Sequence, residues 1–307
     1  RQMRIVIYGA GAMGSFIGGL LSRKHEVCLI GREWHVSSIK RDGLRISGLT
    51  NGVFRPGALS SPSYYKGHAD LVVLTTKAYD TEYAAKEIAK RFPNVPIVSF
   101  QNGLNNIEII GKYIDGRKVY AGTTSHGVTL LGPGQIKHAG TGTTCLGAPD
   151  VESDPDIIEG LADALTAAGI RTEISSDIVN DIWRKGIVNA GINPVTAVAQ
   201  VPNGCVLTSP ELKECAIALS MEAERVANAL GYGIEGGVEE MLKVASRTAH
   251  NRSSMLQDIE RKKQTEIQAI TGVVVAEGER LEIDIDYSEV FLLLVKGIER
   301  TFASQAR

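Results

Sequence analysis

The first half of the chain alternates between short apolar runs and helix-like segments. The apolar runs occupy residues 5–8, 26–30, 69–76, 95–100 and 119–122. Helix-like segments lie between them at residues 15–23 and 81–91. Apolar runs of this length are typical of strands that are buried on both faces of a parallel sheet. The pattern therefore predicts an α/β fold built on such a sheet.

Two stretches of this half are interrupted by glycine and predict shorter strands. They are residues 43–60, which include Asn-Gly, and residues 124–147. We expect the second stretch to form antiparallel strands appended to the sheet. A helix at residues 156–168 and a strand at residues 170–174 complete the α/β region.

From residue 177 onward the pattern predicts helices only. They are expected at residues 177–190, 209–230, 238–249, 267–276 and 286–302. This change predicts two domains, an α/β domain over residues 1–176 and an all-α domain over residues 177–307. Binding sites commonly lie between domains, so we expect a cleft there. Asn193 precedes Pro194, which predicts a kink or an end of the first of these helices.

Composition and charge exclude several classes of function. The chain has 307 residues, of which 43% are hydrophobic, and its net charge is −2, so a nucleic-acid partner is not expected. No apolar run has membrane-spanning length. The cysteines lack C-x-x-C spacing, which favours free thiols in a reducing compartment. His126 and His138 have no partners at metal-ligand spacing and are interpreted as structural or solvated. We expect a cytoplasmic protein without a metal site.

A glycine motif directly follows the first apolar run. Gly9-x-Gly11-x-x-Gly14 stands between a predicted strand and a predicted helix, which is the context in which this motif binds a dinucleotide. Gly9 allows the tight turn, Gly11 lets the backbone approach the phosphates, and Gly14 brings helix and strand together. The N–H groups at the start of the helix then face the anion. The alternative is a structural turn.

The end of the second predicted strand bears on the choice of cofactor. NAD-binding folds place an Asp or Glu there to bind the ribose hydroxyls, but this chain has Gly31 followed by Arg32. An arginine can bind a 2′-phosphate through charge-assisted hydrogen bonds, which favours NADP(H). Glu33 lies one residue further and keeps NAD(H) as a second choice. Arg32 as an ordinary surface residue is the alternative.

Two polar residues follow other predicted strands at their carboxyl ends, where open α/β sheets bind ligands. Lys77 follows residues 69–76 and is a candidate contact to the phosphate or ribose of the cofactor. Asn102 follows residues 95–100 and is a candidate contact to the nicotinamide end or the substrate. An exposed lysine and a turn-forming Asn-Gly pair are the alternatives.

Three polar residues recur at intervals of four in the first predicted helix of the second domain. They are Lys185, Asn189 and Asn193, and they share one face among Ile, Val, Ala and Gly. Polar groups in such surroundings require hydrogen-bond partners, and a polar substrate would supply them. The alternative is an exposed polar stripe. Ser254-x-x-Gln257 and Glu266 are explained equally well as a capping box and a first-turn carboxylate.

Together these motifs resemble one family in order and over essentially the whole chain. They are Gly9-Ala10-Gly11-Ala12-Met13-Gly14, Thr76-Lys77-Ala78, Gln101-Asn102-Gly103, Lys185 with Asn189 and Asn193-Pro194, Ser253-Ser254-Met255-Leu256-Gln257-Asp258 and Thr265-Glu266-Ile267. The chain is similar to the ketopantoate reductases (2-dehydropantoate 2-reductases), NADPH-dependent enzymes of pantothenate and coenzyme A biosynthesis. The resemblance implies a Rossmann-like domain, a helical domain and a small-molecule substrate, a 2-oxo acid, in the cleft.

The resemblance also implies roles for individual residues. Lys185 corresponds to the catalytic general acid and Glu266 to the active-site glutamate. The substrate-binding residues correspond to Asn102, Asn189, Asn193, Asn251 and Ser254. The cofactor-binding residues correspond to the glycine motif with Ala10, Ala12 and Met13, to Asn102, and to the basic residues Arg32 and Lys77. The implied reaction is hydride transfer from NADPH to the C2 ketone, giving (R)-pantoate.

Competing hypotheses keep the fold and change the function. One is a reductase of a different 2-oxo acid or an imine. Another is an NADP-sensing protein without catalysis. Lys185 and Glu266 argue against the sensor, because a sensor needs neither a proton donor nor its partner. The helical domain is also a candidate interface for a homodimer.

Overall fold

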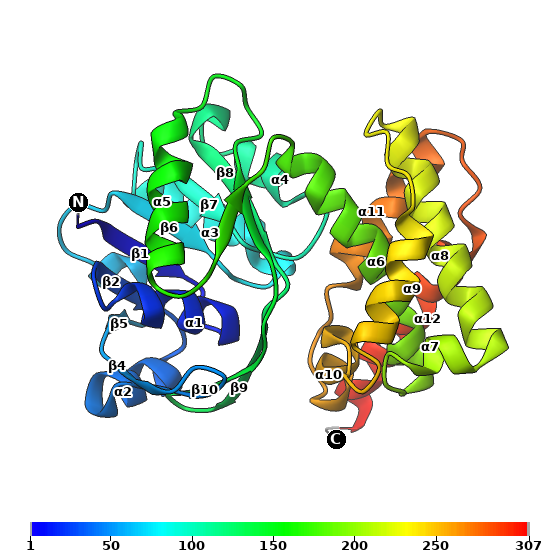
Figure 1. Ribbon diagram of the computed structural model, residues 1–307, viewed down its shortest axis with the longest axis horizontal. Helices are drawn as coiled ribbons and strands as arrows, with labels where there is room; N and C mark the ends of the chain where they lie inside the picture. Colours follow the sequence, from blue (N-terminus) through cyan, green and yellow to red (C-terminus); the bar gives the residue numbers. More distant parts are fainter. Residues whose placement is uncertain (1, 306–307) are drawn as a thin grey trace. The chain divides into compact units, whose positions relative to one another are not determined.

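The computed structural model describes residues 2–305, and side chains as far as Phe302. The chain forms two compact units (Figure 1). The sheet unit comprises the chain up to Gln101 together with Asn106–Val179. The helical unit comprises Asn102–Asn105 and the chain from Asn180 onward. The short segment Asn102–Asn105 therefore belongs to the helical unit, although its neighbours in sequence on both sides belong to the sheet unit.

The main sheet of the sheet unit is parallel over most of its width. Within the described residues it has eight strands, in the order β12-β11-β8-β7-β6-β1-β2-β5. Their bounds are Thr172–Ile174, Thr144–Gly147, Val119–Thr124, Ile97–Ser99, Leu71–Leu74, Arg4–Tyr8, Glu26–Ile30 and Gly57–Leu59. The β11·β8 pair is antiparallel, and the other pairs are parallel. The α/β fold with a parallel sheet is confirmed.

Side chains of β1 alternate between two cores, one on each face of the sheet. Ile5 and Ile7 are buried with residues of α1 (Ala12–Leu21) and α5 (Pro155–Ala167). Val6 is buried on the other face, with residues of α3 (Thr81–Arg91) and α4 (Asn106–Gly111). This period of two explains why each strand is apolar throughout: both faces are covered by helices.

A second sheet corrects the expectation for the glycine-rich stretches. Strands β4 (Gly52–Phe54), β3 (Leu44–Gly48), β10 (Gln135–Gly140) and β9 (Gly127–Gly132) form a separate four-stranded sheet, so β9 and β10 are not appended to the main sheet. In addition, β10 pairs with β3 in parallel. The apolar side chains of this sheet, such as Ile46 and Ile136, join the core around α1. The second sheet therefore covers α1 and buries it.

Helix α2 (Glu33–Asp42) connects α1 to the second sheet through one buried histidine. The Gly134 N–H donates to His35 Nδ1 at 2.9 Å, so Nε2 carries the hydrogen and donates to Ser15 Oγ at 2.9 Å. Burial lowers the pKa of His35, which keeps the ring neutral. Ser15 directly follows Gly14, so this bridge fixes the helix that carries the glycine motif.

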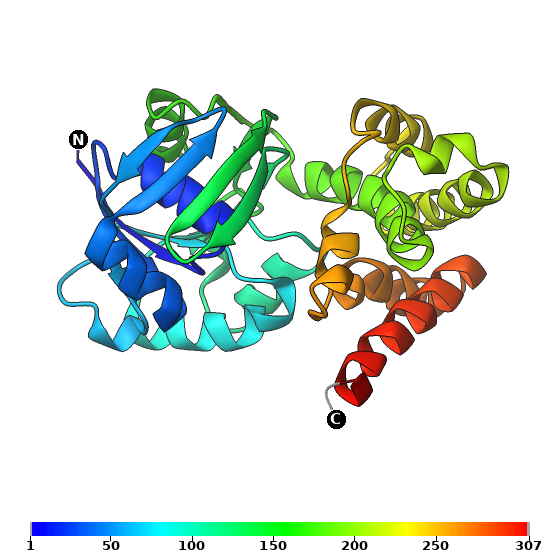
Figure 2. The ribbon, with the colours of Figure 1, turned by 90° about the horizontal axis from the view of Figure 1, so that it is seen from below.

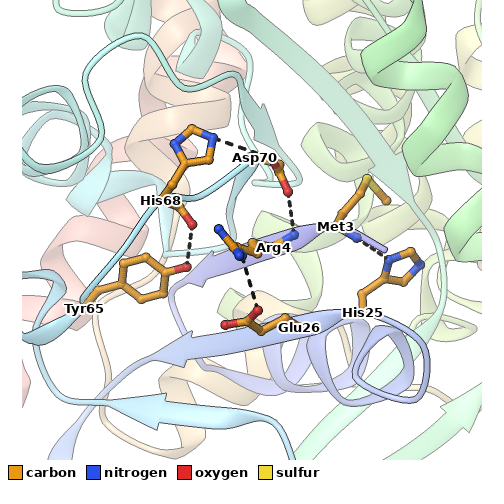
Figure 3. Close-up of polar contacts among 7 residues, drawn as sticks. All are labelled: Met3, Arg4, His25, Glu26, Tyr65, His68 and Asp70. Atoms are coloured by element: carbon orange, nitrogen blue, oxygen red, sulfur yellow. Dashed lines mark hydrogen bonds and ion pairs between the residues drawn. The ribbon is translucent and has the colours of Figure 1, made fainter. Parts of the chain in front are cut away.

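Polar residues tie the amino-terminal ends of three strands of the main sheet together (Figure 3). The Arg4 N–H donates to Asp70 Oδ2 at 2.8 Å, and the Arg4 guanidinium lies 3.4 Å from Glu26. The Met3 N–H donates to His25 Nδ1 at 3.1 Å, and burial lowers the pKa of that ring. These groups bind one another, so this edge of the sheet has a structural role.

The helical unit consists of helices within the described residues. Their bounds are Ile178–Ala199 for α6, Cys205–Thr208 for α7, Pro210–Ala229 for α8, Gly237–Arg247 for α9, Ser254–Glu260 for α10, Ile267–Arg280 for α11 and Asp286–Gln305 for α12. The predicted start of α8 is confirmed, because Ser209 Oγ accepts the Leu212 N–H at 3.3 Å. Short helices α7 and α10 were not predicted.

Asn193 was predicted to kink or end the helix. It does not end it, because α6 continues through Pro194 to Ala199. A proline inside a helix costs about 3 kcal/mol. Here the segment around it is buried, including Ile192, Val195 and Ala197, so tertiary packing outweighs that cost. Thr196 Oγ1 also donates to the Ile192 carbonyl at 2.8 Å.

Two further observations concern the whole described chain. None of its helices combines the length and the apolar composition that a membrane span requires. All four cysteines are free thiols, as predicted.

Candidate active site

The glycine motif forms a turn between β1 and α1 in which each glycine has a different geometry. Gly9 has φ of +111°, and a Cβ there would lie 2.6 Å from the Thr76 nitrogen. A Cβ on Gly14 would lie 2.2 Å from the Gly9 carbonyl oxygen. Around Gly11, by contrast, no other group lies within 4 Å of the Cβ position. Gly9 and Gly14 are therefore required by packing, whereas Gly11 borders open space.

Backbone N–H groups border this open space. The N–H groups of Gly9 and Ala10 donate to the Ile30 carbonyl at 3.0 and 2.9 Å. The first N–H groups of α1, on Ala12 and Met13, have no backbone acceptor within the described chain. Free N–H groups and the positive end of the helix favour an anion, so the turn fits the pyrophosphate of a dinucleotide.

The end of β2 has no room for the carboxylate that NAD-binding folds place there. A Cβ on Gly31 would lie 2.6 Å from Ala10 Cβ. Arg32 begins the turn into α2, is exposed, and forms no ion pair or side-chain hydrogen bond within residues 2–305. The Glu33 carboxylate instead accepts a hydrogen bond from Ser37 Oγ at 2.5 Å, and bonds from Ser37 and Ser60 lower its pKa.

The next two strand ends hold Lys77 and Gln101. Lys77 is half-buried and precedes the short 3₁₀ helix Ala78–Asp80. The Gln101 side-chain amide donates to Thr76 and Thr81 oxygens at 2.8–3.2 Å, and its Oε1 accepts from Ser99 Oγ at 3.0 Å. Gln101 thus fixes the carboxyl ends of β6 and β7 just before the chain reaches Asn102.

In the helical unit, the structure brings Lys185 of α6 to Asn102. Lys185 Nζ donates to Asn102 Oδ1 at 2.9 Å. Burial lowers the pKa of Lys185 to about 8, and the negative charge of Glu266 partly opposes that shift. A lysine in this state holds its proton at neutral pH and releases it readily.

Asn102 reaches this position because its segment is attached to two helices of the same unit. The Leu104 N–H donates to the Ala269 carbonyl of α11 at 2.9 Å. The Leu104 side chain packs on α6 at Gly186, where a Cβ would lie 2.3 Å from Leu104 Cδ2. Gly186 follows Lys185 directly, so the same contact places Asn102 beside the ammonium group.

A small recess borders Asn102. Its lining combines polar side chains with apolar ones, and comprises Asn102, Asn193, Ser254, Met255, Asp258, Glu266 and Ile270. Asn193, Asp258 and Glu266 are buried. Buried amide and carboxylate groups around an apolar wall are typical of a site for a small polar molecule.

The start of α10 explains why Ser254 faces this recess. Ser253, and not Ser254, caps the helix, since its Oγ accepts the Leu256 N–H at 3.1 Å. Ser253 Oγ also lies 2.8 Å from Thr196 Oγ1 of α6. The capping-box alternative for Ser254 is therefore wrong. The Thr265 N–H and hydroxyl donate to Glu299 at 2.8 and 2.5 Å, which holds the turn that carries Glu266.

Two expected substrate residues do not line the recess, and three lining residues were not predicted. Asn189 is half-buried on α6. Asn251 is exposed, and its carbonyl accepts the Asn203 N–H at 2.9 Å. The unpredicted residues are Met255, Asp258 and Ile270. For Asp258 a signal existed in the sequence, because it lies four residues after Ser254 and so on the same helical face.

The two histidines of the second sheet contact each other. His126 Nδ1 lies 3.1 Å from His138 Nε2, and His138 Nδ1 lies 2.9 Å from Thr50 Oγ1. Burial and the neighbouring His138 lower the pKa of His126. Within the described chain, no three His, Cys, Asp or Glu side chains gather as in a metal site.

Comparison with known proteins gives consistent matches over the whole chain. Residues 5–150 match the family described as ketopantoate reductase PanE/ApbA, and residues 177–299 match its C-terminal domain. A 2-dehydropantoate 2-reductase of Archaeoglobus fulgidus is 41% identical over 300 residues, which cover 97% of this chain and 99% of that protein.

Solved structures agree with the sequence matches. A PanE/ApbA family ketopantoate reductase from Ralstonia eutropha JMP134 has a TM-score of 0.89 and 30% identity, covering 98% of this chain and 100% of that one. A D-mandelate dehydrogenase with NADH and anilino(oxo)acetate has a TM-score of 0.90 and 26% identity, covering 98% and 99%. The chain therefore belongs to the ketopantoate reductase PanE/ApbA family of oxidoreductases.

Proposed function

We propose that this enzyme reduces 2-dehydropantoate to (R)-pantoate with NADPH, a step of pantothenate and coenzyme A biosynthesis. The observation that carries the proposal is the Lys185 ammonium group, which has a pKa of about 8 and donates to Asn102 beside a recess that contains Glu266. A proton donor of this kind next to a polar recess suits the reduction of a ketone.

Lys185 is the proposed general acid. When bound, a reduced nicotinamide supplies the hydride for the C2 carbon. Negative charge develops on the ketone oxygen as the new C–H bond forms at C2. The Lys185 ammonium stabilises this charge and then donates a proton to the oxygen. Asn102 orients the ammonium by accepting a hydrogen bond from it through Oδ1. Glu266 favours the charged form of the lysine and so keeps the donor protonated.

The lining of the recess suits the polarity of the proposed substrate. Ketopantoate carries a carboxylate, a ketone and a hydroxyl around a carbon with two methyl groups. We assign those methyl groups to the apolar wall of Met255 and Ile270. Asn251 and Ser254 are the proposed carboxylate contacts, and Asn189 and Asn193 the proposed hydroxyl contacts.

The proposed cofactor site lies on the sheet unit. Gly9, Gly11 and Gly14, with the N–H groups of Ala12 and Met13, would hold the pyrophosphate. Arg32 would bind the 2′-phosphate, because it is exposed and its neighbour Glu33 is already hydrogen-bonded to Ser37. The Gly31 position excludes the carboxylate that selects NAD(H). Lys77 and Asn102 remain candidate contacts to the rest of the cofactor.

The test is the oxidation of reduced nicotinamide in the presence of ketopantoate, with NADPH and NADH measured side by side. We expect fast turnover with NADPH and much slower turnover with NADH. Faster turnover with NADH would support the proposed reductase activity but contradict the assignment of Arg32 to the 2′-phosphate. If neither cofactor is oxidised although NADPH binds, the proposal that ketopantoate is the substrate would be contradicted.

One observation favours a second candidate, a reductase of another 2-oxo acid. The D-mandelate dehydrogenase with NADH and anilino(oxo)acetate has the same fold over nearly the whole chain. Ketopantoate and an aromatic 2-oxo acid such as phenylglyoxylate should therefore be compared directly. A higher kcat/KM for the aromatic acid would support the second candidate. NADPH binding without reduction of any 2-oxo acid or imine would support a sensor.

A further inference from the structure

His35 is a buried polar residue next to the proposed 2′-phosphate contact. It lies in the first turn of α2 and is 1% exposed. Its N–H donates to the Arg32 carbonyl at 3.0 Å. The proposed hydride and proton transfers do not use this side chain. A buried polar group requires hydrogen-bond partners, so the partners of the ring show which parts of the molecule it holds together.

The ring of His35 contacts α1 through a serine beside the glycine motif. Its Nε2 donates to Ser15 Oγ at 2.9 Å, and Ser15 is fully buried. The Ser15 N–H in turn donates to the Gly11 carbonyl at 3.0 Å. Three hydrogen bonds therefore connect the backbone of Arg32 to Gly11, which borders the open space proposed for the pyrophosphate.

The other ring nitrogen fixes the orientation of the ring. Gly134, in the turn between β9 and β10, donates its N–H to Nδ1 at 2.9 Å, so Nδ1 is the acceptor and Nε2 the donor. Ser38 of α2 donates to the Pro133 carbonyl of the same turn at 3.1 Å. Figure 2 shows α1, in dark blue, against the second sheet, whose strands are blue and green. The turn of that sheet holds the ring, and the ring connects α2 to α1.

Other contacts of this region hold α2 with less directional precision. The Ile30 carbonyl attaches the end of β2 to the glycine turn, but Arg32 lies two residues further, where the chain enters α2. Val36 and Ile39 of α2 are buried among apolar side chains. Apolar burial is not directional, whereas a hydrogen bond requires a narrow range of distance and angle. The bond from His35 to Ser15 therefore defines where α2 stands relative to α1.

We propose that His35 is a positioning residue that sets the spacing between the two phosphate sites of the cofactor, and thereby the preference for a 2′-phosphorylated nucleotide. This inference rests on the proposed function, which places the pyrophosphate at the start of α1 and the 2′-phosphate at Arg32. A guanidinium binds phosphate through parallel hydrogen bonds, a geometry that depends on the position of its backbone.

The ribose of the nucleotide makes the spacing matter. It joins the two phosphates covalently, so a ligand that carries both must meet both sites at one distance. A ligand that carries only the 5′-phosphate has no such requirement. A change in the spacing should therefore weaken binding of the first ligand and leave binding of the second nearly unchanged.

Two substitutions at His35 separate the two hydrogen bonds of the ring. In His35→Gln the amide nitrogen takes the place of Nε2 and donates to Ser15. In His35→Asn the shorter side chain places an acceptor near the position of Nδ1 and does not reach Ser15. The first variant keeps the link to α1, and the second keeps only the link to Gly134. Each loses one buried hydrogen bond, so a merely structural role predicts similar effects for both.

The probes are adenosine 2′,5′-bisphosphate, which carries both phosphates, and adenosine 5′-monophosphate (AMP), which lacks the 2′-phosphate. Isothermal titration calorimetry of the full chain should give about tenfold tighter binding of the bisphosphate, both for the natural sequence and for His35→Gln. For His35→Asn we expect this ratio to fall to about twofold, with the affinity for AMP nearly unchanged. Ser15→Ala removes the acceptor at the other end of the bond and should reproduce this loss.

Ser38→Ala is the matched control, because it removes a hydrogen bond between α2 and the turn of the second sheet but keeps the link to α1. Its ratio should stay near that of the natural chain, and thermal unfolding checks that every variant is folded. A ratio that is unchanged in His35→Asn and Ser15→Ala, or that falls equally in His35→Gln, would overturn this inference alone. Equal binding of both nucleotides by the natural chain would overturn it together with the assignment of Arg32. The assay contains no 2-oxo acid, so its result does not depend on the identity of the substrate.

Discussion

The two candidate binding regions of this enzyme are built in different ways. The glycine turn of the sheet unit uses the backbone of consecutive residues, from Gly9 to Gly14. The recess of the helical unit uses side chains from the Asn102 segment, α6, α10, α11 and the turn before α11. Leu104 attaches the Asn102 segment to this recess, because it contacts both α6 and α11.

This difference separates steric requirements from chemical ones. In the turn, Gly9 and Gly14 leave no space for a Cβ, so any side chain there displaces backbone. In the recess, the proposed function depends on the charge and protonation of side chains. Substitutions in the turn should therefore change cofactor binding, and those in the recess should change turnover.

The largest effect is expected for Lys185→Ala. Removal of the general acid should lower kcat by roughly a hundredfold or more. The affinity for NADPH should stay unchanged, because the proposed phosphate contacts lie in the sheet unit. Steady-state kinetics and nucleotide binding, measured by fluorescence titration, check the two halves of this expectation.

Lys243→Ala is the matched control for that variant. Lys243 is an exposed lysine on α9 of the same unit, so its loss should leave kcat unchanged. Normal turnover of Lys185→Ala would contradict the assignment of Lys185 as the proton donor. A parallel loss of NADPH affinity would contradict the separation between the two regions.

The next largest effect is expected for Gly11→Ala. Its Cβ meets no protein atom, so the fold should be unaffected, but the methyl group occupies the space proposed for the pyrophosphate. Crowding of this kind costs about 2 kcal/mol, which corresponds to roughly a thirtyfold rise in the KM for NADPH. Thermal unfolding and cofactor KM should be measured together.

Gly160→Ala serves as the control, because Gly160 also has no neighbour near its Cβ position and lies inside α5. It should leave the KM for NADPH unchanged and raise stability slightly. If Gly11→Ala binds NADPH normally, the open space beside Gly11 is not the phosphate site.

The pH dependence of kcat/KM tests the role of protonation in the recess. The protonated form of Lys185 is the proposed donor and its pKa is about 8. The kcat/KM for reduction should therefore be constant below pH 8 and fall about tenfold per pH unit above it. The residual activity of Lys185→Ala should lack this fall. A fall that persists in the variant would assign it to another group.

The titration of Lys185 does not destabilise the fold above pH 8, so unfolding caused by this group cannot explain the expected fall in kcat/KM. Burial lowers its pKa from the ordinary 10.5 to about 8, so between these values the unfolded chain binds more protons than the folded one. The contribution of this group to the free energy of unfolding therefore rises with pH in that window. Activity and this part of the stability should change in opposite directions.

The same contrast explains what could be predicted from the sequence. The strands β1 and β2, the turn and helix α3 follow from short-range patterns, and these were located closely. The contact between Lys185 and Asn102 joins residues far apart in sequence, so both residues were predicted as candidates but their contact was not. The separate sheet around β10 and the continuation of α6 past Pro194 are decided by tertiary packing, which local propensity does not contain.

The smallest effect is expected for Arg32→Ala, and it concerns the choice of cofactor. A guanidinium bound to the 2′-phosphate contributes about 1.4 kcal/mol at an exposed position, which is about tenfold in the KM for NADPH. NADH lacks that phosphate, so its KM should change little. Arg45→Ala, an exposed arginine on β3 of the same unit, should change neither. Equal losses for both cofactors would mean that Arg32 acts on the fold of the β2–α2 turn, and the steric exclusion at Gly31 alone would then disfavour NAD(H).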